Sequence, residues 1–217
     1  MTEAEPGAKS SLLEADRAKA FIDAVVAIAM TLLILPLMES VSEAAANDEG
    51  PGEWFAEHTG QLIAFALSFA IIAMFWMNHH RLFARVQRMS PALLWITVAW
   101  LFSIVWLPVA TAMSGQMPSD DPVVIAVYIG SMLLTSTLSL TTRVYLRLHP
   151  ALHAIDPASE LRGIAVDLAM ITLFAASLAV AVAVPQVSYF ALLLMWLTGP
   201  MQRVFSRLLR WRASRHV

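Results

Sequence analysis

Residues 24–38 read Ala24-Val25-Val26-Ala27-Ile28-Ala29-Met30-Thr31-Leu32-Leu33-Ile34-Leu35-Pro36-Leu37-Met38 and contain no charged side chain. A helix needs about 20 mostly apolar residues to cross about 30 Å of hydrocarbon, because lipid offers no hydrogen bonds to exposed backbone groups. Similar runs recur along the chain. The sequence therefore predicts six transmembrane helices, at residues 20–38, 59–78, 91–113, 122–146, 161–184 and 186–204.

The composition agrees with a membrane protein. Of the 217 residues, 59% are hydrophobic and only 14% are charged, whereas soluble domains contain about 25% charged residues. We expect an all-α, polytopic fold whose helices leave no room for a soluble catalytic domain. The chain has no cysteine and no zinc-hydrolase, nucleophile-elbow or phosphate-loop motif. We therefore expect no enzyme activity, no cofactor and no metal site, and the net charge of −2 suggests no nucleic-acid partner.

Basic residues predict the orientation, because Lys and Arg are retained on the cytoplasmic side of short loops. All 14 precede the first span, follow the second or the sixth, or separate the fourth from the fifth: Lys9, Arg17, Lys19, Arg81, Arg85, Arg88, Arg143, Arg147, Arg162, Arg203, Arg207, Arg210, Arg212 and Arg215. We expect a multi-pass protein with both termini cytoplasmic. Residues 1–19 would form a cytoplasmic segment, residues 20–205 the membrane domain, and residues 206–217 a basic tail held against membrane lipids.

The connections on the opposite side contain no basic residue. The first carries six acidic side chains between residues 39 and 57, and the second carries Asp120 and Asp121. With Gly50-Pro51-Gly52 near its centre, the first connection is typical of a solvated, turn-rich linker.

Four ionisable residues fall near the cytoplasmic ends of predicted spans: Asp23, His79, His80 and Asp167. Charges within a membrane helix are costly unless they are paired or hydrated. We interpret these residues as a structural network of Asp, His and Arg. The alternative is a proton relay through Asp23, Asp167 and His79/His80 in a proton-coupled secondary transporter. Adjacent histidines point about 100° apart on a helix, so His79 and His80 are poorly placed to chelate one metal ion.

One stripe of the first span has helical spacing: Ile28, Thr31, Leu32 and Leu35. Asp23 falls roughly on the opposite side. Apolar stripes in helices usually pack against neighbours, and a threonine there often bonds its own backbone, so packing is the first interpretation and an aqueous pathway the second. Pro36 and Pro108 each remove a backbone donor and are expected to bend their helices.

The segment from Arg17 to Leu35 resembles the first helix of the transmembrane protein 175 family of potassium channels, found in bacteria and lysosomes. The family signature is R-x-x-x-F-S-D followed by a run like A-I-A-I-T-L-L-V-L. Arg17, Phe21 and Asp23 match it, whereas Ile22 replaces the serine. The stretch His79-His80-Arg81-Leu82-Phe83 resembles the family's W-x-x-H-H-R-L-F, and Leu107-Pro108-Val109-Ala110-Thr111-Ala112 resembles its L-P-F-P-T-A.

The resemblance implies a weakly selective potassium leak channel in a cell membrane, here a bacterial inner membrane. It implies a homotetramer whose first helices line one central pore for monovalent cations, with K⁺ as the permeant ion. Carried over by position, the constriction is Ile28, Thr31, Leu32 and Leu35, and the supporting motif network is Arg17, Phe21, Asp23, His79, His80 and Arg81. Pro36 stands where relatives often carry an acidic residue. Besides the transporter, a membrane scaffold without transport is the other alternative.

Overall fold

The computed structural model describes residues 6–118, 121–183 and 198–213, and every regular element within them is helical. Most turns between the helices are short. The elements are α1 (Pro6–Leu32), α2 (Leu35–Ala46), α3 (Pro51–Glu57), α4 (Thr59–Phe83), α5 (Pro91–Gln116), α6 (Pro122–Leu148), the 3₁₀ helix η1 (Pro150–Leu152), α7 (Pro157–Ala183) and α8 (Thr198–Ala213).

Five segments of the described chain are long and apolar enough to cross a membrane. They are α4, α5, α6, most of α7, and a first segment that joins most of α1 to α2. Their cores coincide with five of the six predicted spans, so the chain is an all-α, multi-pass membrane protein. Most of the sixth predicted span, residues 186–204, lies outside the described residues. The structure resumes at Thr198 with α8, which continues beyond that span to Ala213.

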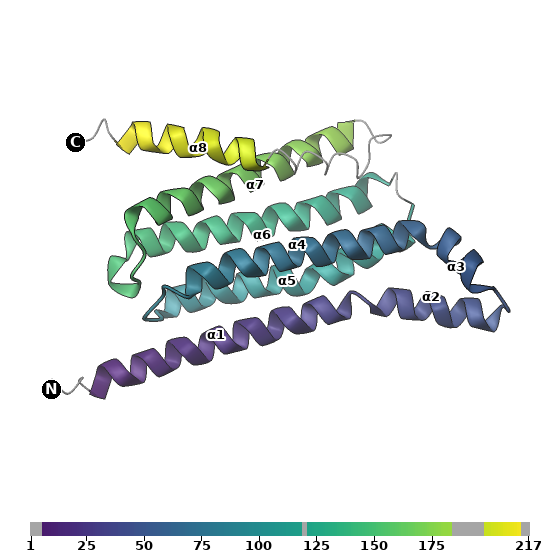
Figure 1. Cartoon of the computed structure of the whole chain (residues 1–217), viewed down its shortest axis with the longest axis horizontal. Coiled ribbons are helices and arrows are strands. Elements are labelled where there is room, and N and C mark those ends of the chain that lie inside the picture. Colours follow the sequence, from purple (N-terminus) through teal and green to yellow (C-terminus); the bar gives the residue numbers. More distant parts are fainter. Residues whose placement is uncertain (1–5, 119–120, 184–197, 214–217) are drawn as a thin grey trace.

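The long helices lie side by side along one common direction (Figure 1). α6 packs between α5 and α7, α8 lies against α7, and α1 lies along α4 and α5. The start of α1, the turns 84–90 and 149–156 and the end of α8 gather at one end of the molecule; α2, α3 and the turn after α5 gather at the other. The described basic side chains therefore collect toward the first end, and the acidic residues 39–57 toward the second.

Proline and capping side chains begin the membrane helices. Pro91 and Pro122 occupy the first turns of α5 and α6, where a missing N–H breaks no helical bond. Ser90 Oγ accepts from Leu93 N at 3.2 Å, and Asp121 Oδ1 accepts from Val123 N at 2.7 Å. Asp156 precedes α7 in the same manner, and its hydrogen bonds with Ser159 lower the pKa of its carboxyl. Local sequence thus fixes where these helices start.

The expectation of a turn-rich linker after residue 38 is wrong for most of that segment. α2 continues to Ala46, and α3 forms directly at Pro51. Trp54 of α3 is buried with Leu37 and Ala44, and its Nε1 donates to Ser40 Oγ at 3.3 Å. Burial of this large ring holds the short helix α3 against α2. The polar composition of the segment gave no indication of this packing.

Buried hydroxyl groups join α4, α5 and α6 in the apolar interior. Ser68 Oγ lies 2.7 Å from the Tyr128 hydroxyl, and Thr111 Oγ1 lies 2.8 Å from Ser68 Oγ. All three residues are buried. Because hydrocarbon offers no replacement partner, these contacts favour one register of the three helices.

We expect Tyr128→Phe to lower the free energy of unfolding by about 1 kcal/mol, since it removes one buried hydrogen bond and keeps the ring. Denaturant titration in detergent, followed by tryptophan fluorescence, measures the change. The control is Tyr145→Phe, whose hydroxyl bonds Ser90 at 2.8 Å in a partly buried position and should matter less. A Tyr128→Phe protein as stable as the unmodified chain would contradict the assignment.

Candidate functional site

The first membrane helix divides into a buried and an exposed face. On the buried face Val26, Ala29 and Leu33 are at most 2% exposed, and they belong to the core formed with α4 and α5. On the other face Ile28 is 59%, Leu32 37% and Leu35 48% exposed. Because an α-helix has 3.6 residues per turn, these two sets of residues lie on different sides of α1. The packing that holds α1 in place therefore leaves the predicted constriction residues outside the subunit's core.

Thr31 is the polar member of the exposed face. Its hydroxyl donates to the Ile28 carbonyl at 2.8 Å, within the same helix. Threonines in helices often bond a backbone carbonyl of the preceding turn in this way. It uses the single hydroxyl proton, so the oxygen still offers lone pairs to another group.

The two prolines of the membrane helices have different effects. α1 ends at Leu32 and α2 begins at Leu35. The bend expected at Pro36 is therefore a break in the helix at residues 33 and 34. Pro108 lies inside α5, and that helix is continuous from Pro91 to Gln116. Both prolines remove a backbone N–H donor from their helices. Of these two helices, the one that contains Pro36 is broken and α5 is not.

Asp23 connects the inner end of α1 to α4. Trp76 Nε1 donates to Asp23 Oδ1 at 2.8 Å, and His80 Nδ1 lies 3.5 Å from the same oxygen. Trp76 and His80 are four residues apart and share one face of α4. A hollow of about 40 Å³ beside them is lined in part by Lys19, Asp23 and His80. The contacts fix α1 against α4 near the basic end.

The remaining motif residues do not join this contact within the single chain. His79 is buried, and its ring stacks on Phe83 at 4.1 Å and on Trp100 at 3.9 Å between centroids. Arg17, Phe21 and Arg81 are exposed. In the described chain no group of three His, Cys, Asp or Glu side chains is placed to hold a metal ion.

Ile22, which stands in place of the family serine, is buried on the inner face of α1. Only 3% of its surface is exposed, and it packs in the main core. The hydroxyl of the signature is therefore replaced here by apolar contact between α1 and its neighbours.

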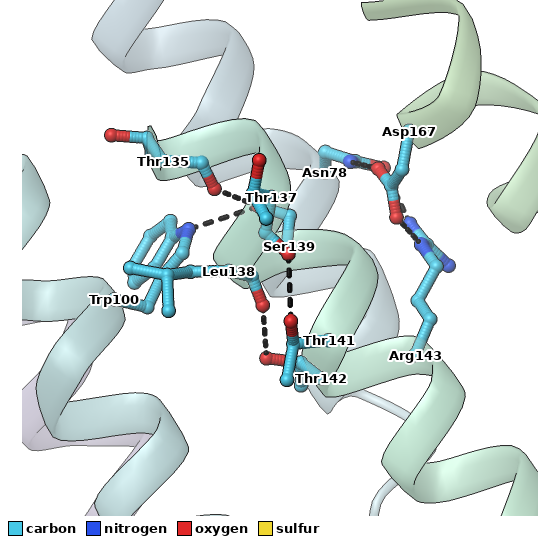
Figure 2. A network of polar contacts seen from close by, with 10 residues as sticks. All are labelled: Asn78, Trp100, Thr135, Thr137, Leu138, Ser139, Thr141, Thr142, Arg143 and Asp167. Carbon is cyan, nitrogen blue, oxygen red and sulfur yellow. Dashed lines mark hydrogen bonds and ion pairs between the residues drawn. The ribbon is translucent and has the colours of Figure 1, made fainter. Parts of the chain in front are cut away.

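A second polar cluster lies apart from Asp23 and joins α4, α6 and α7 (Figure 2). Arg143 Nε donates to Asp167 Oδ2 at 2.6 Å and Arg143 Nη2 to Asn78 Oδ1 at 2.6 Å. Asn78 Nδ2 closes the ring with a 2.9 Å bond to Asp167 Oδ1. The Asp167 side chain is 1% exposed and that of Arg143 11%. We call Asn78, Arg143 and Asp167 the buried triad.

Sequence reasoning did not assign Trp76, Asn78 or Arg143 to a site. The four-residue spacing of Trp76 and His80 was a usable signal, because it places both on one helical face. Arg143 lies 24 residues before Asp167, and Asn78 lies 89 residues before it. No local pattern connects these three residues, since packing of α4, α6 and α7 alone brings them together.

Comparisons with known proteins point to one family. Residues 17–108 match the family described as "Endosomal/lysosomal potassium channel TMEM175". A potassium channel of Streptomyces collinus is 34% identical over 111 residues, which cover 50% of this chain and 51% of that protein. A potassium channel of a Chryseobacterium species is 32% identical over 101 residues, covering 46% and 48%.

A more distant relative is described differently. The "Endosomal/lysosomal proton channel TMEM175" of Danio rerio is 25% identical over 111 residues, covering 51% of this chain and 21% of that protein. The chain thus spans about half the length of the bacterial relatives it matches, and less of this one.

The fold resembles that of a solved channel. The crystal structure of a single-residue variant of the potassium channel MtTMEM175, in complex with a nanobody fusion protein, superposes with a TM-score of 0.63 and covers 89% of this chain and 93% of that one. Sequence identity is 17%, so the likeness concerns the fold alone. The matched family is one of ion channels rather than enzymes.

Proposed function

We propose, from the match of residues 17–108 to the TMEM175 family of potassium channels, that the chain conducts potassium through a pore lined by α1. The pore forms at the centre of a homotetramer. Its constriction consists of Ile28, Thr31, Leu32 and Leu35. Both termini lie in the cytoplasm, and the protein acts in a bacterial inner membrane, where the orientation follows from the basic residues at one end.

The observation that carries this proposal is the division of α1 into two faces. Core packing uses the face of Val26, Ala29 and Leu33, whereas Ile28 and Leu35 are about half exposed. An exposed face of a membrane helix contacts lipid, another subunit or water. The threonine on this face supports an aqueous contact, because its oxygen is an acceptor for a cation.

Selectivity in such a pore arises from dehydration at a narrow apolar neck. Isoleucine and leucine side chains offer no oxygen to an ion, so an ion must shed part of its water there. Potassium loses water more readily than sodium, and the neck therefore favours potassium. No described membrane helix carries a regular arginine ladder of the kind that senses voltage, so we propose a leak channel.

Removal of the Thr31 hydroxyl tests the ion path. We expect Thr31→Ala to lower the ratio of potassium to sodium permeability by about threefold or more, because a partial substitute for hydration water is lost. Reversal potentials in bilayers with paired K⁺, Na⁺ and H⁺ gradients measure the ratio. The matched control is Thr172→Ala on α7, since Thr172 is also exposed and also bonds its own helix, at 2.8 Å from the Leu168 carbonyl.

An unmodified chain that carries no potassium current would contradict the proposed channel. A strict monomer, measured as protein mass in detergent, would contradict the shared pore. Equal permeability ratios for Thr31→Ala and the unmodified chain would remove Thr31 from the path.

The competing hypothesis of a proton-coupled transporter uses Asp23, Asp167 and the two histidines. In the structure Asp167 bonds Arg143 and Asn78, whereas Asp23 bonds Trp76 and faces His80. The two carboxylates thus have separate partners, which gives a relay less support. Saturable uptake driven by a pH gradient would favour it.

A further inference from the structure

The turn between α4 and α5 carries positive charge that the described chain does not neutralise. Residues 58–119 contain no aspartate and no glutamate. Arg85 and Arg88 lie in this turn and are exposed, and no ion pair of the described residues includes either of them. In the next hairpin, by contrast, Arg143 pairs with Asp167. The two arginines of the α4–α5 turn can therefore bind an anion from outside the subunit.

Backbone hydrogen bonds hold this turn in one position. Gln87 N and Arg88 N donate to Leu152 O at 2.8 and 3.1 Å, and Ala154 N donates to Arg85 O at 2.9 Å. These bonds fix the turn on the one between α6 and α7, at the basic end of the molecule (Figure 1). The arginine side chains thus extend from a fixed backbone at a constant level.

Trp95 lies near the same level, in the first turns of α5. It is about 6 Å along the helix axis from Pro91, and 73% of its surface is exposed. The indole N–H groups of three other tryptophans donate to side chains of the protein: Trp54, Trp76 and Trp100. No hydrogen bond of the described residues involves the Trp95 indole. An exposed indole at this level is typical of the region of lipid headgroups, where its N–H finds an acceptor.

An exposed apolar face of α5 continues from Trp95 toward the middle of the membrane. Val98, Phe102 and Val105 follow at steps of three or four residues, so they share one side of the helix with Trp95. All three are exposed, Phe102 by 70%. The distance along the axis from Trp95 to Val105 is about 15 Å, which is half of a hydrocarbon layer of about 30 Å. The face therefore has the length of an acyl chain in one leaflet.

We propose that Arg85, Arg88 and Trp95 bind the headgroup region of one anionic phospholipid, whose acyl chain lies along residues 98–105. The guanidinium groups contact the phosphate, which matches their paired donors. The Trp95 indole donates to an ester oxygen. A zwitterionic lipid brings a choline cation that the arginines repel, so the site prefers a lipid with net negative charge. It rests on the proposed cytoplasmic orientation of the basic end, and not on ion conduction.

Native mass spectrometry of the protein in detergent tests the site, with phosphatidylglycerol and phosphatidylcholine of the same acyl chains as probes. We expect the unmodified protein to bind phosphatidylglycerol at least about tenfold more tightly, because each basic residue near an anionic lipid surface contributes about fivefold. Added salt should reduce this preference. The double variant Arg85→Gln with Arg88→Gln should lose most of it. The matched control is Arg147→Gln, which is also exposed at the basic end but lines a hollow with Glu160, and it should retain the preference.

Trp95→Phe tests the indole donor. It keeps an aromatic ring and removes the N–H, so we expect binding of both lipids to weaken by about threefold while the preference between them persists. Trp106→Phe is the matched control, since Trp106 is also exposed on α5 but lies outside the face from Trp95 to Val105 and deeper in the membrane. It should leave lipid binding unchanged.

Several outcomes would overturn the site. Equal binding of the two lipids to the unmodified protein would do so, and so would an unchanged preference in the double arginine variant. Full competition by inorganic phosphate would indicate a site for the free ion instead of a lipid. A Phe102→Ala protein with a lower oligomer mass and unchanged lipid binding would show that a second copy covers this face. If the double variant fails to fold, the comparison of the two lipids on the unmodified protein decides. None of these measurements uses a potassium current, so the proposed channel is tested separately.

Discussion

Liposomes that contain the Ile28→Asn variant are expected to release potassium at least about tenfold faster than liposomes that contain the unmodified chain, because apolar constrictions restrict flow by dewetting. Ile28 is the most exposed of the apolar constriction residues, at 59%. Asparagine is smaller than isoleucine, and it offers an oxygen and an amide to water, so both its size and its polarity favour a hydrated neck. Hydration of the neck removes a barrier that opposes every ion, so flux rises.

The same change should reduce selectivity. A hydrated neck no longer requires sodium to shed the water it holds more tightly, and the potassium and sodium rates should approach each other. Flux into a potassium or a sodium gradient, measured with the same protein preparation, gives both quantities. A rise in both rates with a smaller ratio between them is therefore the expected pattern.

Ile63→Asn on α4 is the matched control, since Ile63 is 62% exposed but lies on another helix. We expect its flux to equal that of the unmodified chain at equal protein content. Equal flux from Ile28→Asn and the unmodified protein would place Ile28 outside the ion path. A similar gain from both variants would indicate general leakage instead of a pore effect.

Apolar run length predicted the five membrane helices of the described chain but not their full extent. The first helix begins at Pro6 rather than at residue 20, and α4 continues past residue 78 to Phe83. Hydropathy detects the part of a helix that lipid surrounds, whereas a helix can continue into water without changing its backbone bonds. The short helix α3 escaped prediction because its stability depends on Trp54 packing against α2.

The candidate site was predictable where one helix contains it. Helical spacing alone placed Ile28, Thr31, Leu32 and Leu35 on one face, although it could not distinguish a packed face from an exposed one. That distinction depends on which neighbours cover α1. The partners of the charged residues were less predictable, because Asp23 and Asp167 were assigned to one network and the structure gives them different ones.

The buried triad should dominate the stability of the subunit. We expect Arg143→Met to lower the free energy of unfolding by about 3–5 kcal/mol, because it leaves the buried Asp167 carboxylate without its cation. Only 1% of the Asp167 side chain is exposed, so water cannot replace the guanidinium. Detergent denaturation followed by the fluorescence of the chain's tryptophans measures the change.

Arg147→Met is the matched control, one turn further along α6 on an exposed position. It should change stability by less than about 0.5 kcal/mol, as surface substitutions usually do. Equal losses from Arg143→Met and Arg147→Met would show that the ion pair is not what stabilises the three helices.

The double variant Arg143→Met with Asp167→Leu separates the value of the pair from the cost of an unpaired charge. Replacing both partners of a buried ion pair by apolar groups is often close to neutral, whereas removing one is costly. We therefore expect the double variant to recover part of the stability lost in Arg143→Met, the remainder being the cost of leaving the Asn78 amide without its bonds to Arg143 and Asp167. Gly163 provides an independent check, since a Cβ there would overlap the Arg143 guanidinium. Gly163→Ala should thus displace Arg143 from Asp167 and destabilise the unmodified chain, but have little effect once Arg143 is methionine. Additive losses in that combination would mean that Gly163 acts through helix packing instead of through the triad.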